Sequence, residues 1–173
     1  MQRTAPTLFV FSGRPGVGKS TLARHLAAAT NSLWLRIDTL EQALRDLCQI
    51  KVEGEGYRLA YRIAQDNLSL GNSVVADCCN PIALTRNEWQ AISSRAGANH
   101  VDIEVICSDL DEHQARIASR ESEIPGLLLP DWEAVQAREY HSWQGRAIQI
   151  DTAGASVLAS FNALASRLGL AHA

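Results

Sequence analysis

One segment constrains this chain more than any other: Gly13-Arg14-Pro15-Gly16-Val17-Gly18-Lys19-Ser20. It fits the pattern G-x-x-x-x-G-K-[ST], follows a short apolar run and precedes a stretch with helical periodicity. Glycines let successive backbone N–H groups turn toward phosphate oxygens, and the N-terminus of the next helix adds favourable potential. A glycine-rich turn without a ligand is the alternative, but strand, loop and helix together favour a nucleoside triphosphate site.

Two residues of this phosphate-binding loop, or P-loop, have distinct expected roles. Lys19 would reach the β- and γ-phosphates, and the Ser20 hydroxyl would be a ligand of Mg²⁺. The helix that carries both is expected over residues 19–29, because its apolar residues recur on one face.

The order of apolar runs along the chain predicts the fold class. Five runs rich in Val, Ile, Leu and Phe occur at residues 8–11, 33–37, 73–76, 101–107 and 147–150, with helical patterns between them. Most of these runs lack strict alternation, which indicates strands buried on both faces. Strands that alternate with helices imply right-handed crossovers and a parallel sheet with helices on both sides. Ligands of such sheets bind beyond the carboxyl ends of the strands.

Composition limits the remaining possibilities. A chain of 173 residues that is 46% hydrophobic predicts a single domain, residues 1–173, with a core that needs no disulfides. The net charge of −3 gives no global positive field, so we do not expect nucleic acid or a membrane as a partner. No apolar segment has the length of a signal peptide or a membrane span, so a cytoplasmic location is expected. The sequence leaves the oligomeric state open.

Two other classes of P-loop protein fit the sequence poorly. Asp151-Thr152-Ala153-Gly154 spells a GTPase-like D-x-x-G, but no N-K-x-D guanine signature occurs. A mechanical ATPase would usually present paired acids after its apolar strand, whereas Asp77 is followed by Cys78. Small-molecule phosphotransfer therefore remains the favoured class.

Three segments carry a resemblance to a known group of proteins: residues 9–23, Arg36-Ile37-Asp38, and Val74-Val75-Ala76-Asp77 with Asn80-Pro81. They resemble P-loop kinases of the nucleoside-monophosphate-kinase-like group. Within that group the chain is similar to small kinases often labelled AAA-type ATP-binding proteins, which are related to polynucleotide kinase, chloramphenicol phosphotransferase, gluconate kinase and zeta toxin. The resemblance implies a three-layer P-loop NTPase fold with a parallel sheet in the order 2-3-1-4-5. It also implies ATP and Mg²⁺ as cofactors and phosphoryl transfer to a hydroxyl.

Two aspartates follow predicted strands. Asp38 matches the residue that accepts the proton of the attacking hydroxyl in three of those relatives. Its place after the second strand, at the expected N-cap of a helix that begins near Thr39, independently puts it close to the P-loop. The alternative is a capping aspartate without a chemical role. Asp77 is expected near the acceptor or the magnesium ion, with a structural role in a turn as the alternative.

A lid is expected over residues 112–131. Arg116 and Arg120 stand four residues apart on a predicted helix over residues 110–121 and match the R-x-x-x-R lid pair of such kinases. The prolines and the glycine of residues 122–130 would then form the lid loop. Surface arginines that pair with Glu112 or Glu121 are the alternative.

The remaining expected ligand contacts rest mainly on the resemblance. Arg86 is the first candidate for an acceptor-binding arginine, together with Asp38 and Asp77, and Ala153 belongs to the loop expected against adenine. The full ATP-binding set is then Gly13, Arg14, Pro15, Gly16, Val17, Gly18, Lys19, Ser20, Thr21, Arg116, Arg120 and Ala153. Lys19, Asp38 and Arg120 are the expected catalytic residues. The other functional hypothesis is a nucleotide-dependent switch or slow ATPase that acts through a protein partner.

Overall fold

The parallel sheet has its five strands in the spatial order β2-β3-β1-β4-β5, which confirms the predicted fold class and strand order. The computed structural model describes residues 5–145 and 147–170. In chain order the strands are β1 (Thr7–Ser12), β2 (Leu33–Arg36), β3 (Val74–Asp77), β4 (Asn99–Ile106) and β5 (Ile148–Asp151). The first and last residues of these strands differ from the predicted ones by two residues at most.

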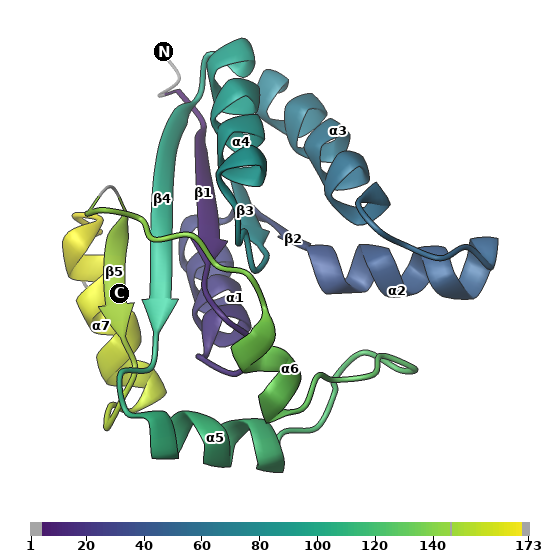
Figure 1. Cartoon of the computed structure of the whole chain (residues 1–173). Helices are drawn as coiled ribbons and strands as arrows, with labels where there is room; N and C mark the ends of the chain where they lie inside the picture. The colour runs from purple at the N-terminus through teal and green to yellow at the C-terminus, as the bar shows by residue number, and fades with distance from the viewer. Residues whose placement is uncertain (1–4, 146, 171–173) are drawn as a thin grey trace.

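Helices cover both faces of the sheet, as Figure 1 shows. They are α1 (Lys19–Thr30), α2 (Ile37–Cys48), α3 (Glu55–Ser69), α4 (Ala83–Ala96), α5 (Leu110–Ser119), α6 (Trp132–Ala137) and α7 (Val157–Arg167). The pair α1 and α7 packs on one face, and α3 and α4 pack on the other. Helices α5 and α6 lie beyond the carboxyl ends of the strands (Figure 1).

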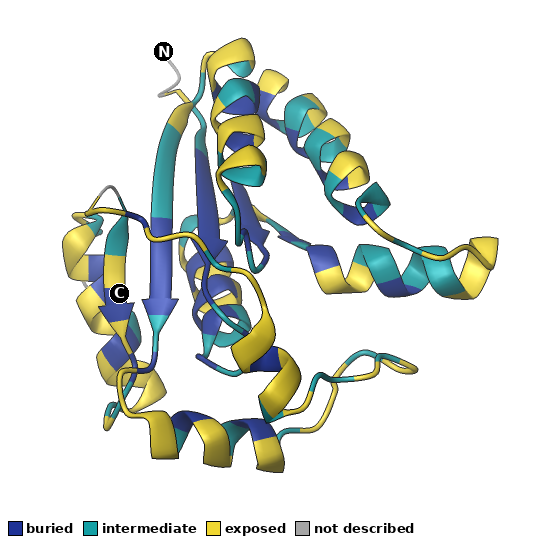
Figure 2. Ribbon diagram, viewed as in Figure 1, coloured by how far each residue is buried: buried dark blue, intermediate teal, exposed yellow. Residues whose placement is uncertain are grey.

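Alternate residues of β1 belong to two different hydrophobic cores. Phe9 and Phe11 pack on the face of α1 and α7, whereas Leu8 and Val10 pack on the face of α3 and α4. Both sets are buried, which explains why the strand shows no alternation of apolar and polar residues. Burial of each such side chain contributes about 1.5–3 kcal/mol. The dark blue strands at the centre of Figure 2 follow from this arrangement.

Helix α2 begins earlier than predicted. Its first residue is Ile37, which is buried beside the end of β2, so the chain enters the helix directly from the strand. Asp38 therefore lies in the first turn, and the expected N-cap role is wrong because Arg36 occupies that position without a side-chain cap bond. The carboxylate still lies where the helix dipole favours a negative charge.

Two further predicted boundaries are corrected near the lid. Helix α5 ends at Ser119, two residues before its predicted end, so Arg120 occupies the C-cap position in an extended conformation. The sequence also predicts that Trp132, Tyr140 and Trp143 lie on one helix after the lid and favours core packing over ligand stacking for them. Helix α6 instead ends at Ala137, and Tyr140 and Trp143 follow it in a loop. Trp143 is buried, as a packing role requires.

Candidate active site

The P-loop connects β1 to α1 by a backbone path that requires glycine at two points. Gly13 has a φ of 139°, and a Cβ there would collide with the Val105 carbonyl oxygen. Gly18 caps α1 in the left-handed region, with a φ of 93°. Both positions favour glycine because L side chains rarely adopt such angles. These two glycines therefore allow the path that the backbone takes through the loop.

The register of the sheet places four polar side chains together at the end of the P-loop. Arg36 of β2 pairs with Asp77 of β3 in the strand register, and the Arg36 Nε atom lies 3.8 Å from Asp77 Oδ2. Ser20 Oγ donates to Asp77 Oδ1 at 3.1 Å. Lys19 Nζ donates to the Arg14 carbonyl oxygen at 2.9 Å. The side chain of Asp77 is only 3% exposed, so this cluster is nearly closed to bulk water.

Burial raises the pKa of the Asp77 carboxyl above its ordinary value, and the charges of Lys19 and Arg36 and the Ser20 hydroxyl oppose this shift. Asp77 Oδ2 is buried without a hydrogen-bond partner. A buried carboxylate oxygen beside a serine hydroxyl fits a small divalent cation that also takes phosphate and water ligands. Ser20, the predicted metal ligand, and Asp77 thus form a donor set suited to Mg²⁺.

A cleft of about 530 Å³ opens above this cluster at the carboxyl ends of β1, β2 and β3. It brings together most of the predicted site residues, namely Pro15, Gly16, Gly18, Lys19, Ser20 and Thr21 with Asp38, Asp77, Arg116 and Arg120. Burial lowers the pKa of Arg120, and the negative charge of Asp38 opposes that shift. The predicted base and the predicted lid arginine therefore face the same space.

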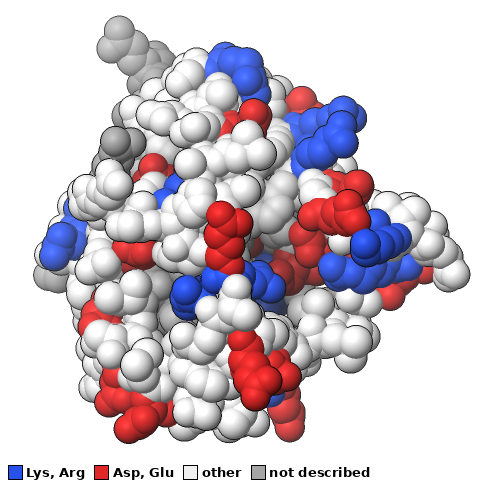
Figure 3. All heavy atoms as spheres, in the orientation of Figure 1, with Lys and Arg blue, Asp and Glu red and all other residues white. Residues whose placement is uncertain are grey.

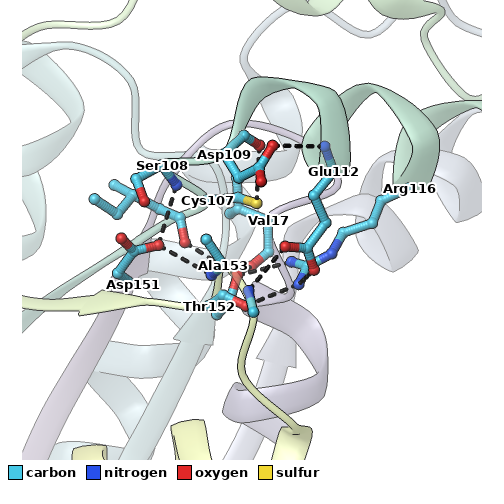
Figure 4. Close-up of polar contacts among 11 residues, drawn as sticks. Val17, Cys107, Ser108, Asp109, Glu112, Arg116, Asp151, Thr152 and Ala153 are labelled. Atoms are coloured by element: carbon cyan, nitrogen blue, oxygen red, sulfur yellow. Dashed lines mark hydrogen bonds and ion pairs between the residues drawn. The ribbon is translucent and has the colours of Figure 1, made fainter.

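Arg116 has a second task besides lining the cleft. Its guanidinium donates to Thr152 Oγ1 at 2.7 Å and to the Thr152 carbonyl oxygen at 2.8 Å, and it pairs with Glu112 at 2.5 Å. Glu112 also accepts from the Gly154 amide, and Asp151 accepts from Ser108 and Ala153. Figure 4 shows these contacts tying the loop after β4 to the loop after β5. The pairing with Glu112 is the one the alternative interpretation expected.

The lid loop, defined here as residues 120–131, contacts the body of the protein at its tip. Glu123 pairs with Arg36 at 3.4 Å and with Arg24 of α1 at 3.7 Å. Gly126 lies so close to Gln42 of α2 that a Cβ at position 126 would be 3.1 Å from Gln42 Nε2. The loop and α2 are therefore closely packed at this point. The loop thus reaches across the cleft to α1, β2 and α2.

Four other expected ligand residues do not line this cleft. Gly13 and Val17 are buried in the P-loop, and Ala153 lies in the loop after β5 that Thr152 ties to Val17. The Arg14 side chain instead donates to the carbonyl oxygens of residues 135, 136 and 138 at the end of α6. Any contact of these four residues with a nucleotide in the cleft would therefore come from their backbone atoms rather than from their side chains.

Arg86 is the clearest departure from the expected site. Its guanidinium lies 3.9 Å from the centre of the Trp143 ring and donates to carbonyl oxygens of Asn80, Pro81, His141 and Ser142. It lines a separate hollow beside α4 and not the cleft that contains Asp38. The structure thus places Arg86 away from Asp38, where it joins the loop after α6 to the loop after β3; its acceptor-binding role stays a prediction.

Sequence reasoning missed a histidine that supports the P-loop. His113 of α5 is 3% exposed, and its Nε2 atom lies 2.8 Å from the Pro15 carbonyl oxygen. Its ring packs edge-on against Trp132 of α6. No local sequence pattern predicts this contact, because His113 and Pro15 are 98 residues apart in the chain.

A family model described as an AAA domain, AAA_33, matches residues 8–137. The chain belongs to the AAA_33 family. The matched range of this AAA_33 protein contains the P-loop, Asp38, Asp77 and both lid arginines. No curated protein sequence matches the chain.

Solved structures show the same fold. The chain is similar to the APS kinase CysC of Mycobacterium tuberculosis in complex with AMPPNP and APS, with a TM-score of 0.70, 16% identity and coverage of 95% of this chain and 98% of that one. A gluconokinase from Sinorhizobium meliloti 1021 gives a TM-score of 0.64 and 18% identity over 96% and 95% of the two chains. A tunicamycin resistance protein of Deinococcus radiodurans gives a TM-score of 0.63 and 18% identity, with coverage of 97% of this chain and 98% of that one. At these identities the likeness shows the fold of small P-loop kinases.

Within residues 5–145 and 147–170, no helix is long and apolar enough to cross a membrane. The same residues contain no group of three or more His, Cys, Asp or Glu side chains arranged to hold a metal ion. A magnesium site built from Ser20, Asp77 and phosphate oxygens would not form such a group, because most of its ligands come from outside the protein.

Proposed function

We propose that this AAA_33 protein transfers the γ-phosphoryl group of ATP to a hydroxyl of a small-molecule acceptor. One observation carries the proposal: the P-loop Lys19, the carboxylate Asp38 and the lid arginine Arg120 line a single cleft at the carboxyl end of the sheet. This arrangement supplies a candidate phosphate site, a candidate base and a cation in one place. The family and the kinases that share its fold support the same reaction class.

The expected chemistry is an in-line displacement. The acceptor oxygen attacks the γ-phosphorus, the bond from that phosphorus to the β,γ-bridging oxygen breaks, and ADP leaves with the bond's electron pair. Asp38 accepts the hydroxyl proton, and it also holds the acceptor in line with the bond that breaks. Lys19 and Arg120 offset the negative charge that spreads over the transferred group.

Mg²⁺ fits the Ser20 and Asp77 donor set described above, and when bound it would neutralise charge on the β- and γ-phosphate oxygens. The protein's own part is to hold the two oxygen donors in place. Arg36 contributes to this because its Nε atom lies beside Asp77 Oδ2.

Asp38→Asn tests the proposed base. The substitution keeps the size of the side chain but removes its ability to accept a proton, so we expect transfer to fall by about 10²–10⁴-fold. ATP affinity, measured by equilibrium titration, should change by less than about threefold because Lys19 and the P-loop are untouched. Asp66→Asn on the exposed face of α3 is the matched control. Unchanged transfer by the Asp38 variant would contradict the assignment of the base.

An acceptor screen separates this function from the alternative of a nucleotide-dependent switch. Sugars, nucleosides, aminoglycosides and phenicols are incubated with ATP and the wild-type chain, and ADP release and phosphorylated product are measured together. We expect at least one acceptor class to stimulate ADP release in step with product. A slow release of ADP that no acceptor changes would favour a switch or slow ATPase.

A further inference from the structure

The cleft continues beyond Asp38 along one face of α2. Asp38, Glu41 and Arg45 stand three and four residues apart, so their side chains project from the same side of the helix. All three line the cleft, and Arg138 lines it from the segment after α6. This surface adjoins Asp38, the proposed base, within the same cleft.

The charges on this surface are paired with one another. Arg45 Nη2 lies 3.3 Å from Glu41 Oε2, and Arg45 Nη1 donates to Gln42 Oε1 at 3.4 Å. Burial raises the pKa of the Glu41 carboxyl, while Arg45 and Arg138 oppose the shift and the negative charge of Asp38 adds to it. The guanidinium of Arg45 is therefore already paired with a carboxylate. In Figure 3, blue and red side chains likewise adjoin over α2 rather than form a patch of one sign.

Glu41 is held in position by a neighbour as well as by charge. It lies against Gly56 of α3, where a Cβ would collide with the Glu41 side chain. Its carboxylate is 21% exposed, so it can meet a ligand but cannot swing freely into solvent. The pair with Arg45 is thus part of a fixed surface.

A surface of this kind discriminates against anions. A carboxylate or phosphate bound by Arg45 or Arg138 would also lie beside Glu41 and Asp38, which repel it. A hydroxyl group both donates and accepts, so it can donate to Glu41 while it accepts from Arg45. The half-buried side chains of Leu127, Leu129 and Pro130 line the same cleft and offer apolar contact for the C–H surface of such a molecule.

We propose that the acceptor is an uncharged, polyhydroxylated molecule of the sugar, sugar-alcohol or nucleoside class. Glu41 and Arg45 bind hydroxyls next to the one that reacts at Asp38, and they select against an acceptor with a carboxylate or phosphate. This inference rests on the proposed phosphotransferase function and names the acceptor class of the same cleft.

Matched pairs of acceptors test the inference with the full chain. The probes are glucose and gluconate, ribose and ribose 5-phosphate, and adenosine and adenosine monophosphate, each with ATP and Mg²⁺. We expect kcat/KM for the neutral member to exceed that of its anionic partner by at least about tenfold in every pair that reacts. A preference for the anionic members would overturn the acceptor class while it leaves the phosphotransferase function intact.

A binding measurement keeps the inference testable when no probe is phosphorylated. Calorimetric titration of the same pairs into protein loaded with Mg²⁺ and AMPPNP needs no turnover. Tighter binding of the neutral members supports the acceptor class, whereas equal binding, tighter binding of the anions or no binding of any neutral probe overturns it. Absence of product from every probe counts against the proposed function separately.

Glu41→Gln shows whether the pairing sets the selectivity. The variant leaves Arg45 without its paired carboxylate, so we expect the ratio of anionic to neutral kcat/KM, or of the two affinities, to rise about tenfold. Glu41→Asp should keep the wild-type preference, and Glu133→Gln on the exposed side of α6 is the matched control. A ratio that stays constant in Glu41→Gln, with Tm unchanged, rejects Glu41 as the discriminating residue.

Discussion

The two halves of the cleft are held together by different kinds of interaction. In the P-loop half, Ser20, Asp77 and His113 make contacts that are largely buried, and one partner of the His113 contact is a backbone carbonyl. In the other half, the tip of the lid loop is held by exposed ion pairs, as in the pair of Glu123 with Arg24, whose side chains are 62% and 54% exposed.

The difference separates two tasks within one cleft. Buried contacts fix geometry because a broken one leaves a polar group without a partner, whereas exposed ion pairs exchange readily with water. The phosphate groups of nucleotides are constant, so a fixed cradle suits them. The acceptor half can differ in its side chains without disturbing that cradle.

Among the variants that compare these two halves, Asp77→Asn in the P-loop half has the largest expected effect. The amide still accepts from Ser20 but has lost the negative charge beside the proposed magnesium site, so we expect Mg²⁺-dependent transfer to fall by about 10²-fold or more. The measurement is the initial rate as a function of Mg²⁺ concentration. Wild-type rates at ordinary Mg²⁺ concentrations would show that Asp77 has only a structural role.

The stability of the same variant should change in the opposite direction. The pKa of Asp77 lies above its unfolded value, so its charged form destabilises the fold at neutral pH, and the cost disappears as pH falls below both values. Asp77→Asn without ligands should therefore melt higher than wild type at pH 7, by about 2–4 °C per kcal/mol gained. The difference should shrink toward pH 3. A constant difference across this range would contradict the pKa direction.

His113→Ala should produce the next largest effect. It removes a buried ring and leaves the Pro15 carbonyl oxygen without a partner, so we expect a loss of about 2–3 kcal/mol in the free energy of unfolding. Denaturant titration measures this loss, with His25→Ala on the exposed side of α1 as the control. The KM for ATP should rise as well. A loss below about 0.5 kcal/mol would mean that the P-loop does not depend on α5.

Glu123→Gln should have the smallest effect, because it tests the exposed half. Its ion pairs with Arg36 and Arg24 are long and largely exposed, so we expect less than about 0.5 kcal/mol in stability. The acceptor KM should change by less than about threefold, and high salt should remove the difference. A tenfold change in KM would place the lid tip among the fixed parts of the cleft.

Local patterns were sufficient to predict the P-loop, the strands and a parallel sheet with helices on both sides. Residues 13–20 combine a motif with its strand and helix, and the apolar run of β1 reflects burial on both faces. The strand order and the lid role of Arg120 came from the resemblance, whereas the place of Asp38 near the P-loop also followed from its position after the second strand, because the carboxyl ends of parallel strands meet at one edge.

Contacts between distant segments were not predictable in this way. The position of the Arg86 side chain depends on its contacts with His141 and Trp143 in the loop after α6, more than fifty residues later in the chain. The support that His113 gives to Pro15 and the contacts of Arg14 with the end of α6 likewise carry no periodic signal. Such pairings follow from the packed fold and not from sequence spacing.

Both stems of the lid end on the P-loop. His113 of α5 contacts the Pro15 carbonyl oxygen, and the Arg14 side chain contacts the end of α6. Residues 14 and 15 are neighbours in the P-loop, so both contacts are made at adjacent positions of one loop. Insertions or deletions within residues 120–131 would thus change the length of a span whose ends stay fixed. Such changes would alter the reach of the lid loop over the cleft while its two anchors on the P-loop stay in place.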